Sequence, residues 1–197
     1  MSPIKIAVCA SGEGSNFQAI VEASRRGDLR AEVVGLLTNR GKIGALGRAL
    51  HLNVESRVLS PGKYKSRSAW DQAMAKQLEA WGAEWVVLAG FLALIGPKVL
   101  AKFPDRVINS HPSLLPKYGG AGMYGERVFE AVVAAGERET GVTFHLVNAR
   151  FDEGRVLHQV KIPVLAGESA AQLAERVKLE ENRLYPKVLN DLIHNPS

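Results

Sequence analysis

Three short segments of this chain are almost wholly apolar, and they constrain the fold more than any other feature. Residues 4–10, 33–37 and 85–89 are rich in Val, Ile, Leu and Ala at both odd and even positions. Strands of this kind are covered on both faces, as in parallel sheets. A further strand is predicted at 106–109, and helix-like stretches alternate with the strands at 16–26, 42–51, 66–81, 97–103 and 127–135. The alternation predicts an α/β fold with a doubly wound, mostly parallel, Rossmann-like sheet flanked by helices.

The chain departs from this rhythm after Gly141. Two more strands are predicted at 142–147 and 156–162, followed by a last helix. Ser169 and Gln172 have the spacing of a capping box, which predicts the start of that helix. No repeat, low-complexity segment or linker marks a second domain, so we expect a single domain over residues 1–197.

Apolar residues at helical spacing in the last helix predict one buried stripe, formed by Leu173, Val177, Leu184 and Val188. Pro186 is expected to kink this helix or to end its first part. Glu180 and Glu181 fall on or beside the stripe, where an unpaired buried charge would be costly. From periodicity alone we expect both carboxylates at the edge of the stripe, in contact with water.

Composition excludes several classes of protein. A single cysteine, Cys9, cannot build a disulfide framework or a multi-thiolate zinc site, and its apolar strand predicts a buried small residue. The start of the chain lacks a signal-peptide pattern, and the longest apolar run, 85–96, is too short to span a bilayer. We expect a cytoplasmic protein without a membrane partner. The net charge of +5 is spread along the chain, which favours an ordinary solvated surface over nucleic-acid binding.

A glycine-rich loop, Ser-Gly-Glu-Gly-Ser-Asn at 11–16, directly follows the first strand. Ser15 and Gln18 have capping-box spacing, so a helix should start here and offer free N–H groups to a phosphate. A dinucleotide fingerprint is disfavoured because Phe17 stands at its third glycine and no acid follows the second strand. A tight turn without a ligand remains the alternative to a monophosphate site. Glu13 would be an awkward neighbour for a phosphate, so its side chain should point away.

The segment Asn-Ser-His-Pro-Ser-Leu-Leu-Pro at 109–116 also follows a strand. Asn109 and His111 are two residues apart, so their side chains share one face of an extended chain. We expect Pro112 and Pro116 to hold the rest of the segment extended. An amide beside an imidazole suits stabilisation of an oxyanion and movement of a proton.

Asp152 lies in a loop between two predicted strands. Taken alone, it is an ordinary turn acid before Gly154. If the loop lay near His111, the carboxylate could raise the pKa of the imidazole and assist proton transfer. His145 and His158 lie in alternating strands, and no two histidines have metal-ligand spacing, so we expect no metal site.

Together these motifs resemble the folate-dependent formyltransferases over residues 4–192. The resemblance rests on residues 12–16, 88–92, 109–116 and 152–154. It implies transfer of a formyl group from 10-formyltetrahydrofolate to the amine of glycinamide ribonucleotide. On this resemblance His111 would donate and accept protons, and Asn109 would hydrogen-bond the formyl oxygen. Asp152 would raise the pKa of His111 and help to order a water that relays protons.

The same resemblance implies two sets of binding residues. Those for the ribonucleotide would be Gly14, Ser15, Asn16, Phe17, Gln18, Lys178 and Glu181. Those for the folate would be Arg67, Leu92, Ala93, Leu94, Ile95, Asn109, Asn148, Ala149, Arg150, Phe151 and Asp152. The chain departs from the usual pattern at Glu13 and at Ala93. It departs also at Glu153 and Arg155 in the loop that carries Asp152, which we call the acid loop, and in the glycine-rich loop 119–125. We expect this last loop to become ordered when substrate binds.

Three other functions are weighed against this expectation. Hydrolysis of 10-formyltetrahydrofolate would use the same Asn, His and Asp set with water as acceptor. The second alternative is formylation of methionyl-tRNA, and the third is nucleotide binding without catalysis. Relatives with the first two activities carry additional domains, which a chain of 197 residues is not expected to accommodate. Binding without catalysis would leave Asn109, His111 and Asp152 unused. A homodimer is left open, because no interface patch is legible in the sequence.

Overall fold

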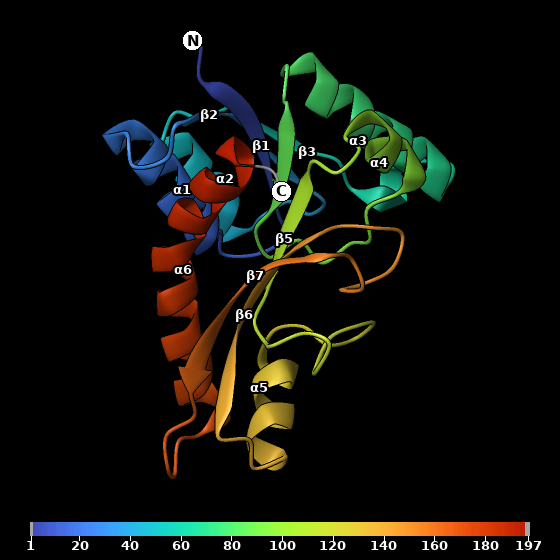
Figure 1. The fold of residues 1–197 in the computed structure, drawn as a ribbon. Coiled ribbons are helices and arrows are strands. Elements are labelled where there is room, and N and C mark those ends of the chain that lie inside the picture. The colour runs from blue at the N-terminus through green and yellow to red at the C-terminus, as the bar shows by residue number, and fades with distance from the viewer. Residues whose placement is uncertain (1, 196–197) are drawn as a thin grey trace.

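A single seven-stranded sheet runs through the part of the chain that the structure describes, residues 2–195 of a computed structural model (Figure 1). Its spatial order is β3-β2-β1-β4-β5-β6-β7. The strands are β1 (Ile4–Ala10), β2 (Ala31–Thr38), β3 (Ser56–Val58), β4 (Trp85–Leu88), β5 (Val107–His111), β6 (Glu139–Leu146) and β7 (Val156–Pro163). Pairing is parallel from β3 to β5 and antiparallel from β5 to β7. The predicted doubly wound, mostly parallel sheet is confirmed.

Helices cover both faces of the sheet, and the sheet separates the core into two parts. They are α1 (Ser15–Arg26), α2 (Gly44–His51), α3 (Arg67–Ala80), α4 (Pro97–Lys102), α5 (Glu126–Ala134) and α6 (Ala170–His194). The first core lies under α1, α2, α5 and α6, whereas the second lies under α3 and α4 on the opposite face (Figure 1). Cys9 is fully buried in the second core, and burial raises the pKa of its thiol to about 12, which leaves it unreactive.

The last helix begins as expected. The Ser169 hydroxyl accepts a hydrogen bond from the Gln172 N–H, and the Gln172 side chain accepts one from the Ser169 N–H. The helix does not end at Pro186, however, but continues from Ala170 to His194. Pro186 is itself buried, and the apolar residues after it pack into the core. This packing offsets the hydrogen bond that proline removes.

The start of α1 corrects a second expectation. Ser15 is the first helical residue and not the cap, because Gly14 occupies the cap position with φ of 75° and no side chain caps the helix. A Cβ at Gly14 would lie 2.7 Å from Ala45, so both the backbone angle and the space require glycine. Gln18 instead hydrogen-bonds Glu22 within the same helix, at 2.7 Å.

The segment after His111 is turned, not extended. The Lys117 N–H donates to the Leu114 carbonyl at 3.1 Å, and the Ser113 hydroxyl donates to the Lys117 carbonyl at 2.6 Å. Tyr118 then adopts a left-handed φ of 56°. These local hydrogen bonds outweigh the extended preference that the prolines impose, and they return the chain towards His111. None of the helices within residues 2–195 is long and apolar enough to cross a membrane.

Candidate active site

The carboxyl ends of β1, β4 and β5 meet at one edge of the sheet, where the order of the strands reverses. From β1 the chain continues outward to β2 and β3, while β4 and β5 lie on the other side of β1. Such a switch point opens a crevice at the strand ends, where ligands bind in open α/β sheets. Ser11 connects the loop after β1 to the loop after β4, since its hydroxyl accepts a hydrogen bond from the Leu92 N–H at 2.9 Å.

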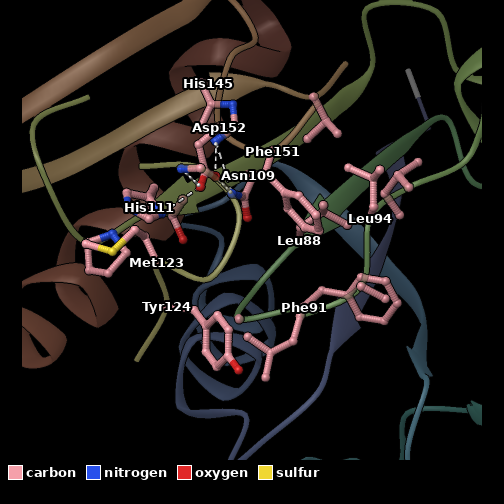
Figure 2. A pocket seen from close by; sticks show the side chains of 18 of the residues that line it. Leu88, Phe91, Leu94, Asn109, His111, Met123, Tyr124, His145, Phe151 and Asp152 are labelled. Atoms are coloured by element: carbon pink, nitrogen blue, oxygen red, sulfur yellow. Dashed lines mark hydrogen bonds and ion pairs between the residues drawn. The ribbon is translucent and has the colours of Figure 1, made fainter. Parts of the chain in front are cut away.

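A polar cluster lies in this crevice (Figure 2). Asn109 and His111 project from β5, and Asp152 approaches them from the loop between β6 and β7. The Asp152 Oδ2 lies 3.4 Å from Nδ1 of His111, and its Oδ1 lies 3.5 Å from the Asn109 amide nitrogen. The proximity that the sequence left open is therefore present. We call the cavity that these residues line the histidine cavity.

The turn after β5 determines which nitrogen of His111 is free to titrate. The Tyr118 carbonyl lies 2.7 Å from Nε2 of His111 and can only accept a hydrogen bond, so Nε2 carries a proton. Nδ1 is then the nitrogen that gains or loses a proton, facing Asp152. Burial lowers the pKa of His111 and outweighs the opposing effect of the Asp152 charge, so the net shift is downward. The expected contribution of Asp152 has the right sign but does not determine the net direction.

Asp152 stays ionised for the converse reason. Burial alone would raise the pKa of Asp152, but the surrounding polar groups, which include the charge of His111 and the Gly120 N–H, hold it below its usual range. The Gly120 N–H donates to Oδ2 at 3.0 Å. The acid is thus a fixed negative charge beside an imidazole that burial keeps neutral at neutral pH.

His145 is a member of the cluster that sequence reasoning missed. It lies on β6 directly opposite Asn109, and its Nε2 is 3.0 Å from the Asn109 amide nitrogen and 3.5 Å from Asp152 Oδ1. It is 2 % exposed. Only the register between β5 and β6 reveals this neighbour, and the sequence alone carries no signal for that register.

Apolar side chains form the wall of the histidine cavity that faces the polar cluster (Figure 2). Leu88 and Phe91 come from the end of β4, and Phe151 precedes Asp152. Met123 and Tyr124, from the loop 119–125, lie on another side of the cavity. Of the residues expected to contact folate, the following line this cavity: Leu92, Ala93, Leu94, Ile95, Asn109, Arg150, Phe151 and Asp152.

A second cavity, which we call the loop cavity, adjoins the first. It is lined by the glycine-rich loop from Gly12 to Asn16, by the start of α5 and by α6. Gly14, Ser15, Asn16, Lys178 and Glu181 of the expected ribonucleotide site all line it. Its wall and that of the histidine cavity share Asn16, Gly90, Leu92, Pro112, Gly125 and Glu181.

Glu181 and its neighbour Glu180 lie in different surroundings. It is half-buried and faces both cavities, where its carboxylate accepts a hydrogen bond from the Ser110 hydroxyl. Glu180, by contrast, pairs with Arg183 at 2.7 Å on the surface, where their side chains are 40 % and 68 % exposed. Both carboxylates thus lie at the edge of the apolar stripe, Glu180 on the outer surface and Glu181 on the walls of the two cavities. The resemblance singles out Glu181 as a binding residue, and that role stays a prediction.

Several expected site residues lie outside both cavities. Phe17 is fully buried in the core, and the Gln18 side chain bonds Glu22 and Arg48. Arg67 donates to the Leu94 carbonyl and lies over the Trp70 ring, behind the wall of the histidine cavity. Asn148 and Ala149 are exposed on the acid loop.

The Glu13 carboxylate turns towards the start of α2. A Cβ added at Gly44 would lie 2.5 Å from its Oε2. The Glu13 carbonyl accepts from Arg48 Nε at 2.8 Å, so α2 supports the loop from behind. Among residues 2–195, no group of three or more His, Cys, Asp or Glu side chains is placed to hold a metal ion.

The sheet order places Asn109, His111 and Asp152 in a crevice at the carboxyl ends of the parallel strands, beside a second cavity. The formyl transferase family model matches residues 4–189, and the chain belongs to this family. It is 39% identical over 188 residues to phosphoribosylglycinamide formyltransferase of chloroplasts from Vigna unguiculata, covering 95% of this chain and 60% of that protein. Phosphoribosylglycinamide formyltransferase from Haemophilus influenzae is 32% identical, over 94% of this chain and 85% of its own length.

Solved structures share the fold. Glycinamide ribonucleotide transformylase 1 from Symbiobacterium toebii superposes with a TM-score of 0.91 at 35% identity, covering 98% of this chain and 89% of that one. Phosphoribosylglycinamide formyltransferase from Bacillus halodurans has a TM-score of 0.90 at 30% identity, covering 98% and 97%. The chain spans about 60% of the length of the plant relatives that it matches.

Proposed function

We propose that this protein transfers the formyl group of 10-formyltetrahydrofolate to the amine of glycinamide ribonucleotide. The observation that carries the proposal is the position of Asn109, His111 and Asp152 in one cavity that opens into a second beside a helix N-terminus. A formyl transferase needs two such cavities, because donor and acceptor must be bound together for transfer. The names of the relatives supply the identity of the two substrates.

The chemistry follows from the protonation states in the site. The acceptor amine attacks the formyl carbon, the bond between that carbon and N10 of the folate breaks, and one amine proton is delivered to N10. A neutral His111 offers Nδ1 as the base for that proton, and Asp152 stabilises the imidazolium that forms. The Asn109 amide would donate to the formyl oxygen as negative charge develops on it. The role of Asp152 in ordering a water remains part of this proposal.

The two cavities suit the two substrates. The apolar wall of Leu88, Phe91 and Phe151 suits the flat pterin ring of the folate. Free N–H groups at the start of α1 suit the phosphate of the ribonucleotide, with Lys178 as a nearby cation. Glu181, at the junction, would meet the amine-bearing end of the acceptor. The cytoplasmic location, the single domain over 1–197, and the absence of metal, nucleic-acid and membrane partners stay predictions, and a homodimer stays an open possibility.

One assay tests the proposal. The protein is incubated with 10-formyltetrahydrofolate and, in separate reactions, with glycinamide ribonucleotide, initiator methionyl-tRNA or buffer alone. We expect formyl transfer only in the first reaction, measured as formylated ribonucleotide and released tetrahydrofolate. Formylated tRNA, or formate released without an acceptor, would contradict the proposal. Folate and ribonucleotide binding without any transfer would favour a binding module.

A further inference from the structure

Ser110 lies between Asn109 and His111 on β5, but its side chain projects from the other face of the strand. Alternation along a strand requires this, because neighbouring side chains point to opposite faces. The Ser110 side chain therefore meets α6, whereas its two neighbours point into the polar cluster. It is 7 % exposed, and its hydroxyl donates a hydrogen bond to Glu181 Oε1.

Glu181 has few other partners for its charge. Burial raises the pKa of Glu181, and the hydrogen bonds from Ser110 and Asn16 and the charge of Lys178 counteract this. Tyr185, one turn further along α6, donates its own hydroxyl to the Leu88 carbonyl at 2.7 Å. The other charged or titratable groups that line the two cavities are Glu13, Glu126, Glu175, Arg150, Tyr124, His111, His145 and Asp152.

The position of Glu181 makes this hydrogen bond functionally relevant. Its carboxylate lies at the junction of the histidine and loop cavities. A ligand that reaches from the helix N-terminus to Nδ1 of His111 must pass this junction. A carboxylate here contributes only when it is ionised and correctly oriented, and a hydroxyl donor favours both conditions.

We propose that Ser110 is a positioning residue for the acceptor, whose hydroxyl holds the Glu181 carboxylate towards the amine-bearing end of the ribonucleotide. The inference deepens the proposed function and rests on it. Strand β5 then serves the reaction with both faces: Asn109 and His111 face the transferred group, and Ser110 orients the carboxylate that meets the acceptor.

Steady-state kinetics with Ser110→Ala, Glu181→Gln and the double variant provide the first test. Ser110→Ala is expected to raise the KM for the ribonucleotide about tenfold, with kcat and the KM for folate little changed. If Ser110 acts through Glu181, the double variant should be little worse than Glu181→Gln alone. Glu180→Gln, next along the helix on the surface, is the matched control and should behave as the unaltered protein. Additive effects, or a loss confined to kcat, would overturn the proposal.

A second measurement does not depend on activity. Carbon-13 NMR of the side-chain carboxyl of Glu181 is followed against pH in the substrate-free protein, with Glu180 as the reference signal. Removal of the hydroxyl should move the Glu181 titration to higher pH and leave that of Glu180 in place. An unmoved titration overturns the role of Ser110 whatever the enzyme does. A moved titration in a protein that does not formylate the ribonucleotide would instead refute the proposed function alone. Ser110→Cys replaces the alanine variant should that variant not fold.

Discussion

The Asn109 amide nitrogen lies 3.0 Å from Nε2 of His145, which occupies the opposite position on β6. The other ring nitrogen, Nδ1 of His145, is 2.8 Å from the Leu146 carbonyl, which can only accept a hydrogen bond. In the neutral ring Nδ1 therefore carries the proton, and Nε2 accepts from Asn109. This arrangement fixes which way the amide points, and leaves its weaker 3.5 Å contact with Asp152 as the one a substrate can replace.

Replacement of His145 by alanine is expected to release this amide. We expect kcat to fall about tenfold, because a misoriented Asn109 stabilises the developing charge less well, with ribonucleotide binding retained. Single-turnover formyl transfer measures the effect. His158→Ala, which removes an exposed histidine from neighbouring β7, is the matched control. Equal rates for both variants would show that Asn109 needs no such support.

Loss of the imidazole should affect chemistry and not binding. His111→Ala is expected to lower kcat by about 10²- to 10⁴-fold, the usual contribution of a positioned acid–base group. Calorimetry should give a ribonucleotide Kd close to that of the unaltered protein, since His111 lines the histidine cavity and not the loop cavity beside residues 12–16.

Replacement of Asp152 by asparagine should also reduce turnover. Full activity in Asp152→Asn would refute its role in proton transfer.

The stability of the protein should fall as the pH drops below about 6.5, partly through His111. Burial lowers the pKa of His111 from its ordinary value of 6.5, so the unfolded chain takes up this proton at higher pH than the folded one. Its stabilising effect is present above 6.5 and is lost as the pH falls through the folded value. Thermal unfolding of His111→Ala between about pH 7.5 and about pH 5.5 should therefore show a smaller decline. An unchanged decline would count against a buried neutral imidazole.

Gly154 fits the acid loop against β6 and leaves no room for a side chain. A Cβ there would lie 1.7 Å from the Leu146 carbonyl oxygen, in contact with backbone that cannot yield. Gly154→Ala should destabilise the fold by about 2 kcal/mol or more and reduce activity by displacing Asp152. Gly47→Ala is the control, because Gly47 lies in α2 with nothing within 4 Å of an added Cβ. It should stabilise the protein by about 0.5–1 kcal/mol, as denaturant unfolding would record.

The glycine-rich loop 119–125 should gain protection when both substrates bind. Gly120, Gly122 and Gly125 all adopt positive φ, and its Met123 and Tyr124 line the histidine cavity. Amide hydrogen exchange with and without ligands measures the change. We expect slower exchange in this loop in the ternary complex, with the strands β1 and β2 as an internal reference. Equal exchange rates in the loop under both conditions would contradict the expectation.

Much of the fold could be predicted because hydrophobic burial is written locally in the chain. β1 runs over Ile4–Ala10, as its apolar run indicates, and the Ser169 capping box marks the start of α6. Strand β3 escaped prediction, since its Ser-Arg-Val sequence is exposed at the sheet edge and carries no apolar pattern. Local signals thus identify elements that bury a face, and miss those that pairing alone creates.

The site was less predictable because its members meet through tertiary structure. Asn109 and His111 could be paired from their spacing on one strand, but His145 joins them only through the β5 and β6 register. The orientation of Glu181 depends on where β5 places Ser110, which no helical periodicity records. The capping assignment at Ser15 failed for a similar reason, since contact with Ala45 requires glycine at the preceding position.

The turn that follows His111 gives the neighbouring loop a direct influence on proton transfer. Its Tyr118 carbonyl holds one nitrogen of His111, and the Gly120 N–H two residues later holds the Asp152 carboxylate. Any withdrawal of this segment would remove a partner from the base and from the acid in a single movement. The acid strength of His111 and Asp152 and the access to the cavity are therefore set by the same few backbone atoms. An inhibitor that displaced this segment would disable the chemistry without touching either side chain.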